Sequence, residues 1–223
     1  MKASVTFLVF IFAASLKTNL LADELPRGNC QSPQAMTDLR HCSFAGKQLA
    51  GLDLHGSLLD GVDFTNAKMT DCNFSGASFR QADFRWAFLL DCQLAQADFT
   101  RADLFHTTLD GSGMNAARLI RANMFGASLN EVVAHNADFS DAYMKDVVME
   151  EGDFQRSNFD RSFMMRAVLI GSKLQHSTFY TVVLTGAALE DSDFSGADMR
   201  RALLNGARLD NASFAGADLS RAR

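Results

Sequence analysis

The chain has 223 residues, of which 48% are hydrophobic and 21% charged, and its formal net charge is −5 at pH 7. This length allows one or two domains with a sizeable core. The composition is that of a globular protein, and the mild negative charge argues against nucleic-acid binding, which needs a basic surface.

The first segment, residues 1–22, differs from the rest of the chain. Lys2 is followed by a largely apolar run from Val5 to Leu16, and the segment then becomes polar. A run of about a dozen apolar residues is too short to span a bilayer and is typical of a secretory signal peptide. We therefore expect cleavage after Ala22, a secreted or periplasmic protein, and no stable membrane span after cleavage. An uncleaved N-terminal anchor is the alternative.

Residues 23–36 precede the repeats described next and are expected to form an N-terminal cap, because the end of a repeat array exposes its core unless it is covered. Export would place the chain in an oxidising compartment, where disulfides form. Cys30 and Cys42 flank the start of the repeats described next, and we predict a disulfide between them.

From Leu39 to Leu219 the sequence repeats every five residues without an insertion. The 37 central positions hold 17 Leu, 12 Phe, 7 Met and one Ala, Ala134. At Ala134 we expect a small void or a local bend, and the alternative is that its large neighbours lean into the space. A step of five residues would spiral around an α-helix and would alternate between the faces of a flat strand. We infer that each repeat is one wall of a coil and that four walls, 20 residues, close one turn.

A recurring tripeptide, Ala-Asp-Phe or Ala-Asp-Leu, carries several of these centres, at residues 82–84, 97–99, 102–104, 137–139 and 217–219. This motif resembles the A(D/N)(L/F)XX signature of the pentapeptide-repeat family, and the resemblance covers residues 37–223. It implies an all-β fold, a right-handed quadrilateral parallel β-helix. The family is functionally broad, so the resemblance says little about activity.

Outward positions on two neighbouring walls carry apolar residues where other coils carry polar ones. A contiguous exposed apolar band is typical of a surface that contacts a partner, a second copy of the chain or a lipid surface. The alternative is that aromatic and branched side chains stack along the coils without any partner. The predicted partner-binding residues are Trp86, Phe88, Phe105, Phe125, Tyr143, Phe163, Met165, Val183 and Leu203.

Charged residues are sorted onto two diagonally opposite corners, which we interpret as solvated edges. The acidic corner is also a weaker candidate for binding a cation or a basic partner. The arginine corner holds Arg80, Arg101, Arg121, Arg161, Arg200, Arg201 and Arg221. The acidic corner holds Asp71, Asp91, Asp110, Glu131, Glu150, Glu151, Glu190, Asp191 and Asp210.

The remaining reactive residues do not form a recognisable site. Cys72 and Cys92 stack at small inward positions, and we expect two buried thiols. His55 and His135 share a column but lie four coils apart, too far for one metal ion. There is no glycine-rich phosphate loop, and flat walls offer no pocket for a catalytic triad. We expect no catalytic, cofactor-binding or metal-binding residue.

The leading interpretation is a non-enzymatic secreted or periplasmic binding scaffold that contacts an unidentified protein through its apolar outer wall. One alternative follows from the resemblance, namely a DNA-mimicking protein that binds gyrase, although a signal peptide opposes it because gyrase is cytoplasmic. A structural envelope component is another. We also expect a homodimer through the C-terminal coils, using Leu203 and Leu219, and no nucleic-acid partner.

Overall fold

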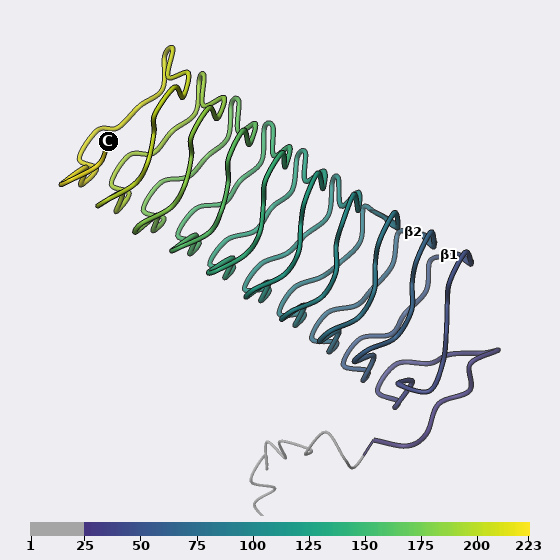
Figure 1. Cartoon of the computed structure of the whole chain (residues 1–223). Helices are drawn as coiled ribbons and strands as arrows, with labels where there is room; N and C mark the ends of the chain where they lie inside the picture. Colours follow the sequence, from purple (N-terminus) through teal and green to yellow (C-terminus); the bar gives the residue numbers. More distant parts are fainter. Residues whose placement is uncertain (1–24) are drawn as a thin grey trace, which may run out of the picture.

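The structure, a computed structural model, describes residues 25–223 as a four-sided rod (Figure 1). Successive coils pair in parallel at residues 20 apart, as in Asp38 with Leu58 and Ser43 with Asp63. Each coil contributes four such pairing positions, one to a wall. The predicted period of 20 residues and the four walls are confirmed, whereas the predicted signal peptide lies outside the described residues.

Regular strands are short and confined to one wall near the N-terminal end. They are β1 (Gln48–Ala50), β2 (Lys68–Thr70) and β3 (Phe88–Leu90), paired in parallel in the order β1-β2-β3. On the other walls of residues 25–223, neighbouring coils pair through single bridges. The cause is the repeat itself, because two of every five residues form a corner and leave too little extended backbone for a longer ladder.

The corners contain a left-handed residue at every fifth position from residue 36 to residue 221, except at His41. Twelve of these residues are glycine and 25 are not. A positive φ is uncommon outside glycine, so hydrogen bonds must hold the corner. At a typical corner, the Ala97 N–H donates to the Leu94 carbonyl at 3.1 Å, and the Gln96 N–H donates to Asn115 of the next coil at 2.8 Å.

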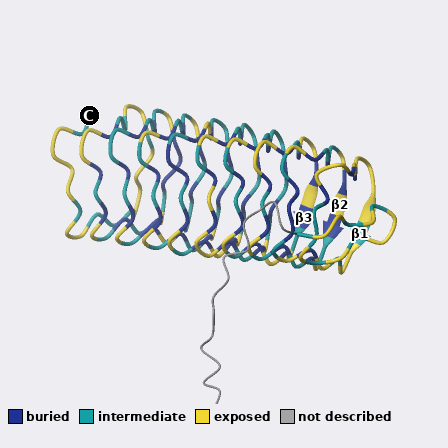
Figure 2. Ribbon diagram, turned by 90° about the horizontal axis from the view of Figure 1, so that it is seen from below, coloured by how far each residue is buried: buried dark blue, intermediate teal, exposed yellow. Residues whose placement is uncertain are grey.

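The central residues of the repeats fill the interior of the rod. Phe139, Phe159 and Phe179 stack from coil to coil with ring centroids 4.8 Å apart. Burial is complete along most of the axis and is lost in the last coil, where Leu209 and Leu219 are each 40% exposed (Figure 2). The apolar interior is therefore open at that end of the described chain.

Ala134 is fully buried in this interior. In the next coil of the same column, the Phe154 ring lies 6.1 Å from the rings of Phe139 and Phe159. The Phe154 ring also lies over Gly152, where any side chain would collide with it. The void or bend expected at Ala134 stays a prediction.

The small inward positions contribute polar contacts as well as volume. The Ser177 hydroxyl donates to the Phe154 carbonyl at 2.8 Å, and the Ser112 hydroxyl donates to the Leu89 carbonyl at 2.9 Å. Each of these two buried hydroxyls ties its coil to the one before it. Cys72 and Cys92 are free and buried, as expected.

The described part of the cap, from residue 25, pairs with the first coil through Arg27 and Asp38. Its Gly28 N–H donates to the Asp38 carbonyl at 2.9 Å. Cys30 and Cys42 form the predicted disulfide, with their Cα atoms 5.4 Å apart. The cap is therefore fixed to the rod both covalently and through its backbone.

Candidate functional site

A continuous row of aromatic side chains runs along one outer wall and its corner, and we call it the aromatic ladder. It brings together five of the predicted partner-binding residues and adds one histidine. Its members are Trp86, Phe105, His106, Phe125, Tyr143 and Phe163.

The rings of the aromatic ladder are in contact from coil to coil. The Phe105 and Phe125 rings stack with centroids 5.4 Å apart, and Tyr143 stacks on Phe163 at 5.5 Å. Phe125 and Tyr143, at 6.2 Å, join the two pairs. Tyr143 is 41% exposed, while the three phenylalanines are half-buried. The ladder therefore presents ring edges to solvent over several coils.

Trp86 and His106 form the N-terminal end of the ladder at a corner of the rod. Their rings stack at 4.4 Å, and Trp86 remains 51% exposed. His106 has a positive φ, which directs its side chain along the rod over Gly126. A Cβ atom on Gly126 would lie 2.5 Å from the imidazole, so glycine in the next coil makes room for the stack.

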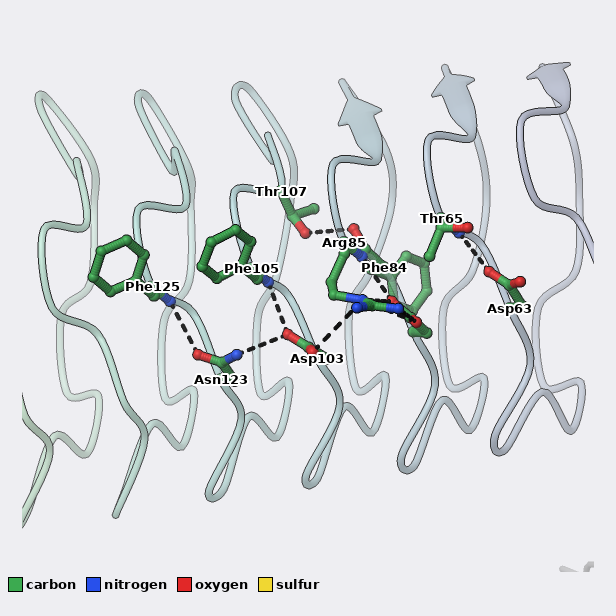
Figure 3. A network of polar contacts seen from close by, with 10 residues as sticks. Asp63, Thr65, Phe84, Arg85, Asp103, Phe105, Thr107, Asn123 and Phe125 are labelled. Atoms are coloured by element: carbon green, nitrogen blue, oxygen red, sulfur yellow. Dashed lines mark hydrogen bonds and ion pairs between the residues drawn. The ribbon is translucent and has the colours of Figure 1, made fainter.

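The column that carries Tyr143 is polar in the preceding coils (Figure 3). There, Asp103 accepts a hydrogen bond from the Phe105 N–H at 3.2 Å and another from the Asn123 amide at 2.8 Å. Asn123 in turn accepts from the Phe125 N–H at 3.4 Å. These side chains therefore accept hydrogen bonds from backbone N–H groups of the corner that follows them. Phenylalanine has no such acceptor, so Phe163 in this column brings apolar surface at the expense of a corner hydrogen bond.

The other predicted residues divide between two places. Val183 and Leu203 continue the column of Phe163 through direct bridges, and Met165 lies beside them, all half-buried. Phe88, in β3, is 40% exposed and lies instead on the next wall. There it helps to form a shallow groove of about 400 Å³, lined by Gln48, Leu49, Ala50, Lys68, Thr70, Phe88 and Leu90.

The arginine corner carries ion pairs rather than arginines alone. Arg161 binds the Asp141 carboxylate at 2.7 and 3.1 Å, and these hydrogen bonds hold the pKa of Asp141 below its usual range. Arg80 binds Asp98 at 2.8 Å. All four side chains are partly exposed, so the pairs contribute little individually to stability.

One cluster has the side-chain types of a metal site. Cys30, His41 and Cys42 bring their donor atoms within 4.8 Å of one another. Both sulfur atoms are used by the disulfide, however, and a thiolate is the form that binds zinc. In this oxidised form the cluster serves as a covalent anchor for the cap.

A family model for pentapeptide repeats matches the chain with eight copies, at residues 37–76, 48–85, 77–115, 112–150, 151–186 and 184–221. The chain belongs to the pentapeptide-repeat family. Pentapeptide-repeat proteins fold as right-handed quadrilateral β-helices, which confirms the predicted fold class. They are generally non-enzymatic structural or protein-binding proteins.

Three solved structures of pentapeptide-repeat proteins are similar to this one. HetL, involved in heterocyst differentiation regulation in the cyanobacterium Nostoc sp. strain PCC 7120, is 22% identical over 81% of this chain and 87% of its own, with a TM-score of 0.32. Full-length QnrB1, a plasmid-mediated fluoroquinolone resistance protein, is 16% identical over 79% of this chain and 92% of its own, with a TM-score of 0.44. A protein of the Arabidopsis thaliana thylakoid lumen is 22% identical over 67% of this chain and 69% of its own, with a TM-score of 0.26.

No curated protein matches this pentapeptide-repeat chain. Across residues 25–223, no helix has the length and apolar character needed to cross a bilayer.

Proposed function

We propose that this pentapeptide-repeat protein is a non-enzymatic, exported scaffold that binds a protein partner through the aromatic ladder. The observation that carries the proposal is the unbroken contact of rings from Trp86 to Phe163 on the outside of the rod. Large exposed apolar patches mark interaction sites, and aromatic residues are enriched where protein partners meet.

The orientation of the rings favours a protein as the partner. Phe105 and Phe125 are nearly parallel, at 11°, as are Tyr143 and Phe163, at 3°. Each ring face is therefore turned toward a neighbouring ring, and the partner meets ring edges and the aliphatic side chains of Met165 and Val183. Such a surface offers apolar contact area with few hydrogen-bonding groups, which suits the apolar core of a protein interface.

The test compares the capture of envelope proteins by the wild type and by Phe163→Asp. We expect the aspartate to reduce recovery of a bound protein at least tenfold, since it places a charge in the apolar contact. Gln93→Asp is the matched control, because it adds the same charge at an exposed outward position on the opposite wall. Equal recovery by all three proteins would contradict the proposal and favour a structural envelope role.

Export is the second part of the proposal and rests on the apolar run in residues 1–22. We expect the mature chain to start near Asp23 and to fractionate outside the cytoplasm. Mass spectrometry of the purified N-terminus measures this directly. An intact, cytoplasmic chain would contradict export and would restore the gyrase-binding alternative.

We also propose that the apolar end of the last coil is covered by a second copy of the chain. Leu209 and Leu219 are strongly exposed there, and Leu204 and Phe214 are half-buried, unlike the centres of the middle coils. Together they form an apolar surface at the end of the rod, and Leu203 lies on the adjoining outer wall beside Arg201 and Arg221. Sedimentation at about 10–50 µM should show a dimer if the pairing is stable, and a monomer throughout this range would contradict it.

A further inference from the structure

The arginine corner contains a pocket that the proposed function does not use. It has a volume of about 440 Å³, within the range typical of small-molecule sites. Its lining residues are Asp60, Arg80, Gln81, Thr100, Arg101, Ile120 and Arg121. We propose that this pocket binds a phosphate group, either as the free ion or as part of a small organic ester.

Two guanidinium groups of the pocket retain binding capacity. Among the described residues, no carboxylate lies within ion-pair distance of Arg101. Arg121 lies 3.9 Å from Asp141, a long contact to a carboxylate that Arg161 already binds at 2.7 Å. Arg101 and Arg121 occupy the same column in adjacent coils, so both can donate to one ligand.

The acidic residue of the pocket, Asp60, uses one of its two carboxylate oxygens in hydrogen bonds within the corner. Asp60 accepts hydrogen bonds through one carboxylate oxygen from the Ser78 hydroxyl and from the Arg80 N–H, the latter at 3.0 Å. Arg80 itself is bound to Asp98 at 2.8 Å. The local balance around Arg101 and Arg121 is therefore positive, on a chain whose net charge is negative.

The floor of the pocket adds two features that an organic phosphate could use. Thr100 lines the pocket beside the two arginines and carries a hydroxyl group. Ile120 contributes an apolar surface beside it. Guanidinium forks match phosphate oxygens in pairs, and a phosphate carries enough charge and enough acceptors to engage two of them.

The experiment titrates the purified protein with inorganic phosphate and, separately, with phenyl phosphate at low ionic strength, using calorimetry. We expect saturable binding to one site, weakened at least tenfold by Arg101→Gln or Arg121→Gln. Tighter binding of phenyl phosphate would assign the organic ester as the ligand, and equal binding would assign the free ion. Both outcomes support the phosphate site.

Arg156→Gln is the matched control, because Arg156 occupies the same position of another corner with φ 60°, against 61° for Arg101 and 57° for Arg121. It should leave binding unchanged. Thr100→Val, which keeps the shape and removes the hydroxyl, should weaken binding severalfold. Binding that falls equally in Arg156→Gln, or no saturation by about 10 mM ligand, would overturn the proposal. Unfolding midpoints confirm that each variant is folded.

Discussion

Single side chains at the corners reach along the rod and lie over the coil that follows. His106 covers Gly126 and His176 covers Gly196, each with its imidazole about 2.5 Å from where a Cβ atom would stand. The backbone explains the pattern, because a residue with positive φ at a corner directs its side chain along the axis. Glycine in the next coil leaves the space that the imidazole fills. Its positive φ alone would not require glycine, because 25 other corner positions with positive φ hold different residues.

We predict that Gly126→Ala disrupts the stack of Trp86 on His106. Alanine at φ +62° costs roughly 1–2 kcal/mol in backbone strain, and its Cβ displaces the imidazole. Because Trp86 is the only tryptophan, its fluorescence reports the change. Gly76→Ala separates the two effects, since Gly76 has a similar φ of +66° and nothing within 4 Å of its Cβ. An unchanged Trp86 spectrum in Gly126→Ala would contradict the prediction.

The sequence indicated five of the six ladder residues, because a strict period of five identifies which side chains point outward. His106 was missed, because the apolar pattern that selected Trp86 in the same corner column does not select a histidine. The partners of the buried serines were missed as well. They lie 23 residues away, whereas the period read from the sequence pairs residues 20 apart.

At the scale of one wall, stability comes from stacking like side chains on successive coils. Phe159 is fully buried between Phe139 and Phe179, with both centroids at 4.8 Å. In the last coil, Phe214 stacks on Phe194 alone, at 5.2 Å, and remains half-buried. The same residue type at the same position of the repeat therefore has two different environments.

We predict that Phe159→Ala lowers the free energy of unfolding by about 3–5 kcal/mol, the cost of a large cavity in a packed core. Phe214→Ala should cost roughly 1–2 kcal/mol, because less apolar area is withdrawn from water. Chemical denaturation measures both. Equal losses would mean that the last coil is covered in solution, and repeating the comparison at lower protein concentration would identify a second copy as the cover.

The whole molecule behaves as a one-dimensional array, in which each coil contacts only its neighbours. We predict that amide hydrogen exchange is slow in the middle coils and fastest from Leu204 to Arg223, where the centres Leu209 and Leu219 are each 40% exposed. Exchange measured by mass spectrometry gives the profile. Uniform protection at high dilution, where a dimer would separate, would contradict it.

Acid should destabilise the rod. Hydrogen bonds from arginine side chains hold the pKa below the ordinary range in four aspartates, Asp38, Asp141, Asp146 and Asp198. A group whose pKa is lower in the folded state stabilises the fold at pH values above its pKa in the unfolded state, which is about 3.9 for aspartate. This stabilisation is lost as the pH falls through the pKa of the folded state. The midpoint temperature of thermal unfolding should therefore decrease as the pH is lowered below about 5. The decrease should be less steep for the Asp141→Asn variant. A midpoint independent of pH down to about 3 would contradict this.

Because every turn of the rod contains 20 residues, distances along its axis are set in fixed steps. Inserting or duplicating one full turn in the middle of the chain would shift everything beyond it by about 4.8 Å along the axis while leaving every corner chemically unchanged. The aromatic ladder and the phosphate pocket could then be moved apart in equal steps. Changes of any other length would rotate one part of the surface away from the other, so this architecture admits new spacings only in whole turns.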